Sequence, residues 1–264
     1  MAALTISLLA VSLPIQTAGI STDQTEVVSP LHLAAWQGHG DAQFLLSVKE
    51  SRVNKEESLF WLKEAAKQGV ADAQFKLGSL YARGIDLPLD HDRAIEWLTL
   101  AAKQGHSWAK HYLGVMYAQG FGVTQNYTTA IMWFRQAANE LNESRYQLAM
   151  LFYSGNGVQK DFNRAFYWFN YAAKEGHTRS KLQVARMYLY GLGVEVDLEQ
   201  AHYWYLRAAK AENVDAQYEL AGLYLDGIGV EQDQEKAHFW YKKAASQGMP
   251  MAQALLSDKY TQGW

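Results

Sequence analysis

The sequence predicts an all-α fold, a superhelical α/α solenoid of about six helical-hairpin repeats of 36 residues each. Three observations lead to this fold class. A tryptophan returns every 35 or 36 residues, an alanine pair begins four residues after each of these tryptophans, and a glycine turn closes most units. The tryptophans are Trp61, Trp97, Trp133, Trp168, Trp204 and Trp240. Such a period is typical of repeat proteins, in which each unit buries its apolar face against its neighbours.

The composition is that of a folded chain in which long helices are permitted. Among the 264 residues, 49% are hydrophobic and 19% are charged, and only 4 are proline. The formal net charge is −3 and no basic stretch stands out, which argues against a nucleic-acid partner. The absence of cysteine excludes disulfides, cysteine metal sites and thiol catalysis.

Residues 1–20 differ from the rest of the chain. Residues 2–15 are almost wholly apolar, and small residues follow at Thr17, Ala18 and Gly19, so the segment resembles a secretory signal peptide. No lysine or arginine precedes Lys49, so the basic region that usually opens such a peptide is missing. We expect a periplasmic or secreted protein, with a cytoplasmic location as the alternative. We expect no transmembrane segment in the mature chain, because the apolar run is short.

Residues 31–54 are predicted to form a degenerate N-terminal capping repeat. The stretch Leu33-Ala-Ala-Trp-Gln-Gly-His matches the end of a repeat helix, but no glycine turn follows it. Residues 55–264 are predicted to form the repeat solenoid itself, with no second domain. Because a solenoid needs atypical units at its ends to stay unassociated, we expect a monomer.

One helix of each unit carries the pattern A-x-x-W-x-x-x-A-A. The spacing i, i+3, i+7 and i+8 places these residues on one apolar helical face, and we expect the tryptophans in the core. The helix is expected to end at a glycine with positive φ. These glycines are Gly69, Gly105, Gly176 and Gly248. Leu141 and Glu212 take this place in two units, whose helix ends must be built differently.

The other helix carries A-x-x-x-L-[GAS]-x-x-Y, as from Ala109 to Tyr117. The small residue after the leucine would let two helix backbones approach closely. The turn that follows, as in Gly120-Phe-Gly-Val, needs backbone conformations that bulky residues resist. Acidic residues such as Asp161 and Asp197 lie where the next helix starts, and we expect them to cap its free N–H groups.

These two motifs resemble the Sel-one-like repeat family, a relative of the tetratricopeptide repeats, over about residues 31–264. The resemblance implies a right-handed superhelix that binds other proteins, often as a scaffold in signalling, secretion or host contact. Bacterial members are commonly exported, which agrees with the apolar N-terminus. The expected function is therefore that of a protein–protein interaction scaffold or adaptor, which binds a partner protein or peptide on its concave face.

The resemblance also implies which helix carries the binding surface. The inner surface of the family is lined mainly by the L-G-x-x-Y helix, so we expect contacts two residues before, two after, and five or six after its leucine. The candidates are Phe75, Arg83, His111, Gln119, Tyr146, Tyr153, Arg186, Tyr190, Tyr218 and Asp226. Aromatic rings and arginine are frequent interface anchors. Phe75, Tyr146 and Tyr218 share one recurrent position, and packing between repeats is the alternative for them.

The sequence assembles no catalytic or metal-binding motif. Ser107-Trp-Ala-Lys110 has the form S-x-x-K, but the partner elements of serine penicillin-recognising enzymes are missing, and no H-E-x-x-H pair occurs. We therefore predict no cofactor, no metal and no enzyme activity. The alternative is a secreted hydrolase acting on cell-wall or β-lactam substrates through residues that the fold brings together. A host-directed effector would differ from the scaffold only in its partner.

Overall fold

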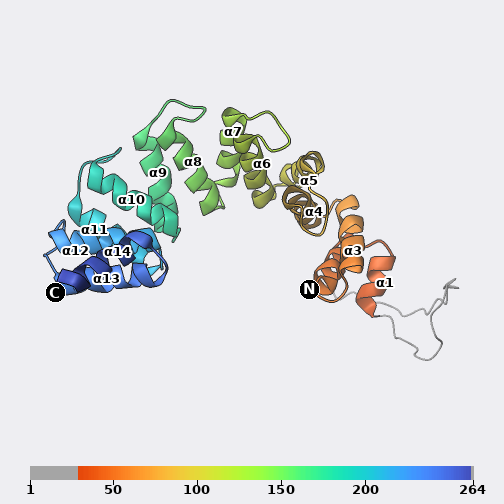
Figure 1. Ribbon diagram of the computed structural model, residues 1–264. Helices are drawn as coiled ribbons and strands as arrows, with labels where there is room; N and C mark the ends of the chain where they lie inside the picture. Colours follow the sequence, from red (N-terminus) through yellow and green to blue (C-terminus); the bar gives the residue numbers. More distant parts are fainter. Residues whose placement is uncertain (1–28, 263–264) are drawn as a thin grey trace, which may run out of the picture.

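The structure, a computed structural model, describes residues 29–262, and over this range the chain forms fourteen α-helices and no strand. The helices follow one another along an arc whose two ends turn to the same side (Figure 1). The predicted all-α solenoid of hairpin repeats is confirmed. The signal peptide expected at residues 1–20 lies outside the described residues, as do residues 263–264.

Two kinds of helix alternate along the chain. The even helices, which carry the L-[GAS]-x-x-Y motif from α4 onward, are α2 (Gly40–Glu50), α4 (Ala71–Arg83), α6 (Ser107–Gln119), α8 (Asn142–Ser154), α10 (Thr178–Tyr190), α12 (Val214–Asp226) and α14 (Pro250–Gln262). The odd helices, which carry the tryptophan motif from α3 onward, are α1 (Pro30–Trp36), α3 (Lys55–Lys67), α5 (His91–Lys103), α7 (Tyr127–Ala137), α9 (Phe162–Lys174), α11 (Leu198–Lys210) and α13 (Gln234–Ser246). From α2 to α13, each even helix packs most closely on the odd helix that follows it, and this pair is the hairpin.

The small residue of the even helix allows the close packing within a hairpin. A Cβ atom at Gly114 would lie 2.7 Å from the ring of Phe134, and one at Gly78 would lie 2.9 Å from Cγ of Leu98. Real side chains do not tolerate such distances, so the missing side chain sets how near α6 and α7, or α4 and α5, can come. Where alanine takes this place, as at Ala149, it is fully buried.

The tryptophans are less uniformly buried than the sequence pattern predicts. Trp61, Trp204 and Trp240 are buried, whereas Trp97, Trp133 and Trp168 are only half-buried. Among the half-buried ones, Trp133 of α7 packs against the buried cluster formed by α3 to α6. The residue after each tryptophan points into its own hairpin instead and is buried in every unit. These residues are Leu62, Leu98, Phe134, Phe169, Tyr205 and Tyr241.

The turn and the cap that join the two helices of a hairpin form as predicted. Gly120 and Gly122 both have positive φ, +75° and +69°. Asp161 and Asp197 stand before α9 and α11, where each side chain accepts a hydrogen bond from the backbone N–H three residues later. These caps satisfy N–H groups that the helix itself cannot pair.

A second recurrent cap closes the other end of the odd helices. Glutamine side chains on the next even helix donate to the carbonyl of the alanine pair, from Gln74 to Ala66 at 3.1 Å and from Gln217 to Ala209 at 3.2 Å. The last carbonyls of a helix have no partner within it, so these glutamines supply one and join their hairpin to the preceding one.

The two units that lack the closing glycine end their odd helix in different ways. Glu212 itself adopts the left-handed conformation, with φ +59°. In the other unit α7 ends early at Ala137, and the Arg145 guanidinium donates to the carbonyls of Ala138 and Asn139 at 2.6 and 2.8 Å. A single arginine therefore takes the place of both the closing glycine and the glutamine cap in this unit.

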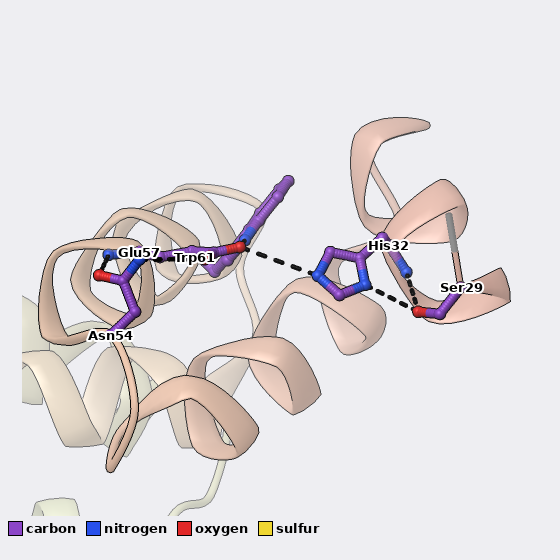
Figure 2. A network of polar contacts seen from close by, with 5 residues as sticks. All are labelled: Ser29, His32, Asn54, Glu57 and Trp61. Carbon is purple, nitrogen blue, oxygen red and sulfur yellow. Dashed lines mark hydrogen bonds and ion pairs between the residues drawn. The ribbon is translucent and has the colours of Figure 1, made fainter. Parts of the chain in front are cut away.

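At the N-terminal end, polar contacts fasten α1 to the first complete hairpin (Figure 2). The His32 ring faces the Glu57 carboxylate of α3 at 3.8 Å, and the same carboxylate oxygen accepts from Nε1 of Trp61 at 3.2 Å. Asn54 caps α3 by accepting from the N–H of Glu57. These contacts hold the short α1 against α3, the first helix after the predicted capping repeat of residues 31–54.

Candidate protein-binding surface

The open side of the even helices forms the candidate surface, which we call the inner face. Each even helix buries one side against the odd helix of its own hairpin, so its opposite side remains outside the core. In Figure 1, α4, α6 and α8 lie on the inner side of the arc and α5, α7 and α9 on its outer side. Side chains on successive even helices are thus brought into one row.

The ten predicted binding residues differ in how far they reach this face. Arg83, Gln119, Tyr190 and Asp226 are exposed. Phe75, Tyr146, Tyr153, Arg186 and Tyr218 are half-buried, and His111 is buried. Tyr190 offers the largest free aromatic surface among them, at 64% exposure.

The recurrent aromatic position serves the packing between repeats. The Phe75 ring stacks on His106 of the next hairpin with 4.4 Å between ring centroids. Tyr146 contacts His177 at 5.3 Å, and Tyr218 contacts the Tyr241 ring at 5.3 Å. Phe75 and Tyr146 therefore pack across a seam between hairpins, whereas Tyr218 packs within its own hairpin, formed by α12 and α13.

His111 ties α6 to α8. Its Nδ1 atom lies 2.8 Å from the hydroxyl oxygen of Ser144, and burial lowers the pKa of the imidazole, although Glu143 opposes this shift. A buried, neutral histidine adds little surface for recognition, so we leave His111 out of the proposed contact residues.

Histidines also link successive even helices at the rim of the inner face. His106 and His177 occupy the N-cap positions of α6 and α10, and their Nδ1 atoms accept backbone N–H groups of those helices. Their Nε2 atoms reach back to carboxylates of the preceding even helix, Asp72 at 3.2 Å and Glu143 at 3.3 Å. Each ring thus caps one helix and also links two neighbouring hairpins.

The structure adds residues to the inner face that the sequence reasoning missed. Glu219 of α12 forms an ion pair with Arg186 of α10 at 3.4 Å. Tyr205 and Tyr241 of the odd helices lie buried beneath this face and add no surface to it; burial raises the pKa of both phenols. The sequence does distinguish these two positions, because the residue after the tryptophan is Leu or Phe in four units and tyrosine only in these two.

The residues that could suggest hydrolysis have structural partners. The Ser107 hydroxyl donates to the Glu140 carboxylate, just beyond the end of α7, at 2.6 Å and is buried. No group of three or more histidine or acidic side chains placed to hold a metal ion occurs among residues 29–262.

Within that same range, no helix combines the length and the apolar character that crossing a membrane requires.

The stacked hairpins and their open inner face define the class of the protein, an α/α solenoid of the kind that includes tetratricopeptide-like repeats. The chain belongs to the Sel1 repeat family. The model of the Sel1 repeat matches six segments of it, residues 40–70, 71–106, 109–140, 142–177, 179–213 and 214–249. Each segment joins one even helix to the odd helix after it, which is the hairpin described above.

Solved structures with this fold are similar over most of the chain. A protective antigen of uropathogenic Escherichia coli with an SLR fold is 32% identical, with a TM-score of 0.84, over 88% of this chain and 51% of its own. A Sel1 repeat protein from Oxalobacter formigenes is 30% identical, with a TM-score of 0.74, over 83% of this chain and 88% of its own. The chain thus spans about half the length of the E. coli antigen. Comparison with curated proteins gives no match.

Proposed function

We propose that the chain is a protein-interaction scaffold or adaptor that binds a partner protein or peptide on its inner face. In this proposal it has no catalytic activity of its own and acts as a monomer. The contact residues would be the exposed and half-buried side chains of the even helices, foremost Arg83, Gln119, Arg186, Tyr190 and Asp226.

One observation carries this proposal, the difference between framework and inner-face positions within the chain. The alanine pair of each tryptophan helix, the small residue of the even helix and the capping Asp or Asn recur because each has the same structural role in every unit. The last position of the even helix does not recur. From α4 to α12 it is Arg83, Gln119, Ser154, Tyr190 and Asp226. Side chains freed from packing and varied along one face provide a specific surface, and tyrosine and arginine are common anchors of such surfaces.

Cross-linking in the native cell, followed by purification of the tagged full chain, tests the proposal. The inner-face variant combines Arg83→Glu, Tyr190→Ala and Asp226→Arg, three exposed positions on α4, α10 and α12. We expect it to lose the captured partner by more than tenfold while its thermal melt stays unchanged, because none of these side chains is buried.

A matched outer-face variant supplies the control. It combines Met132→Ala, Tyr167→Ala and Phe239→Ala, which replace large side chains that are 47%, 60% and 51% exposed on odd helices. This variant should capture the partner as the wild type does. Equal capture by the inner-face variant, or loss of capture by the outer-face variant only, would show that the inner face is not the binding surface.

Export is the remaining part of the proposal and rests on residues 1–20. The mass of the full-length protein recovered from periplasm or medium tests it. A product shortened near Gly19 is expected, and an uncut product in the cytoplasm would remove the export step without affecting the scaffold role.

A further inference from the structure

Lys181 is a buried cation in the first turn of α10, a helix that packs on α9 and α11. The residue is 8% exposed, and its ammonium group forms no ion pair and donates no hydrogen bond among the described residues. Burial lowers the pKa of this lysine, and the positive charge of Arg207 lowers it further. Buried lysines are rare and normally paired, because an unpaired ammonium group loses its hydration without compensation.

The same position on other even helices has a structural use that Lys181 does not share. Gln74, Arg145 and Gln217 each stand fourth in their helix and donate to a backbone carbonyl at the end of the preceding odd helix. Lys181 also stands fourth in its helix, but it makes no such bond. Capping of the preceding helix therefore does not account for the lysine.

A second recurrent position supplies partners to this residue in other hairpins. It lies seven residues after each tryptophan, just beyond the odd helix, and its side chain reaches the even helix of the same hairpin. Gln104 donates to Gln74 at 2.8 Å. Gln247 donates to Gln217 at the same distance. The fold thus brings the residue after an odd helix to the fourth residue of the even helix before it.

In two hairpins the even helix carries a cation at this position, and the residue after the odd helix is then a glutamate. Glu140 belongs to the hairpin of Lys110, and Glu175 belongs to the hairpin of Arg145. The Glu140 carboxylate does reach the even helix, because it accepts from the Ser107 hydroxyl of α6. The chain therefore combines a cation at one position with a carboxylate at the other.

The hairpin of Lys181 has the cation without the carboxylate. Ala211 stands where the glutamates stand, and it is exposed, so this place opens to solvent. The adjacent Glu212 is engaged elsewhere, in an ion pair with Lys243 of α13 at 3.5 Å. Arg207 lies one turn before Ala211 on the same side of α11, and its guanidinium contacts only aromatic rings and a tyrosine hydroxyl among the described residues.

We infer that Lys181, with Arg207 beside it, binds a carboxylate side chain of a partner protein, which enters over Ala211. This carboxylate takes the place that Glu140 and Glu175 hold in the two preceding hairpins. A single negative charge suits the site, because the carbonyl groups at the end of α9 disfavour a doubly charged anion such as phosphate. The inference rests on the proposed function, since it needs a partner protein, and it adds an acidic contact at the edge where the odd helices end.

A carboxylate supplied by the chain itself provides the first test. Ala211→Glu should raise the melting temperature of the full chain by about 2–4 °C, because it pairs the buried ammonium group. Ala211→Gln has the same size without the charge and should raise it less. Lys181→Gln should melt at or above the wild-type temperature, since glutamine fills this position in α4 and α12. A melting temperature lowered by Ala211→Glu would overturn the inference.

Peptides selected against that variant provide the second test. A phage library of random dodecapeptides is depleted on immobilised Ala211→Glu protein and then panned on the wild type, and a recovered peptide is measured by fluorescence anisotropy. We expect an aspartate or glutamate whose replacement by the amide weakens binding about tenfold. Lys181→Gln should weaken binding by the same factor, and the two changes together should cost no more than either alone. Lys210→Gln, which removes an exposed lysine of α11, is the matched control and should change binding less than twofold.

The outcomes separate this site from the proposed function. Peptides without an acidic residue, losses that multiply when both changes are combined, or an equal loss from Lys210→Gln would overturn the inference. The absence of any peptide after depletion would overturn it as well. A native partner that Lys181→Gln captures as the wild type does, but that the inner-face variant loses, would leave the scaffold role intact and remove only the acidic contact. Failure to capture any native partner would overturn both proposals.

Discussion

At the scale of single residues, position relative to the tryptophan decides burial. The residue after each tryptophan lies between the two helices of its own hairpin, whereas the tryptophan lies at the seam with the preceding one. Phe134 is 1% exposed and contacts the space left by Gly114, while the adjacent Trp133 is half-buried. The more prominent residue of the sequence pattern is therefore not the more deeply buried one.

This difference predicts an order of stability among core variants. Phe134→Ala should lower the free energy of unfolding by about 3–5 kcal/mol, because it removes a fully buried ring and leaves a cavity. Trp133→Ala should cost less, about 2 kcal/mol, since its ring is only partly buried. Urea unfolding followed by circular dichroism measures both. A larger loss for Trp133→Ala would contradict the assignment of the seam.

The same two residues show why the sequence predicts the fold well and the surface poorly. Core positions repeat because each unit meets the same neighbours, so six copies of one pattern are visible in a single chain. Periodicity gives no measure of depth, and it could not separate Trp133 from Phe134. The ion pair between Arg186 of α10 and Glu219 of α12 could not be predicted from the sequence, because it joins two hairpins and neither residue recurs from unit to unit.

At the scale of the element, the hairpin turn is the most constrained segment of the unit. Gly157 has φ +72°, and a Cβ atom there would lie 2.1 Å from Cβ of Tyr127, the first residue of α7. The turn of one hairpin is thus pressed against the start of the preceding odd helix. Gly69, which closes α3, also has a positive φ, +91°, but a Cβ atom there would meet no other atom within 4 Å.

Substitutions at these two glycines distinguish the energetic cost of a positive φ from the cost of steric overlap with a neighbouring helix. Gly69→Ala should destabilise by about 1 kcal/mol, the cost of a left-handed conformation for a residue with a side chain. Gly157→Ala should cost about 3 kcal/mol or more, because overpacking against Tyr127 adds to the same conformational cost. Thermal melts of the two variants give the comparison, and equal losses would mean that the turn can move away from α7.

At the scale of the whole molecule, stability depends on contacts between neighbouring hairpins. Polar side chains supply several of these contacts along the arc. Gln104, which follows α5, donates to the carbonyl of Gly69 at the end of the preceding hairpin at 2.8 Å, and Gln74 of α4 donates to the carbonyl of Ala66 of α3 at 3.1 Å. His111 and His177 bridge further seams, so protonation of histidine acts on the stacking of the solenoid as well as on single helices.

Acid should therefore loosen the solenoid between pH 7.5 and 5.5. Burial lowers the pKa of His111, His177 and His202 below the ordinary value of 6.5. A histidine whose pKa is lower in the folded than in the unfolded state binds protons preferentially when unfolded. Its contribution to stability is complete above pH 6.5 and is lost as the pH falls from there toward the folded pKa. Protonation of His177 would also place a positive charge at the N-terminus of α10 and remove its Nδ1 acceptor.

The chain itself supplies the replacements that test this dependence. Asn213 caps α12 where His177 caps α10, Phe75 fills the place of His111, and Phe166 packs on Tyr188 as His202 packs on Tyr224. The triple variant His111→Phe, His177→Asn, His202→Phe should therefore fold and show a urea midpoint that hardly changes over this range. The wild-type midpoint should fall with acid, because these histidines take up protons on unfolding. Carboxylate caps such as Asp233, whose pKa is held low by its hydrogen bond to Lys236, stay ionised there and add nothing to this fall. A wild-type midpoint that is flat between pH 7.5 and 5.5, or a triple variant that falls equally, would show that these histidines do not govern the stacking.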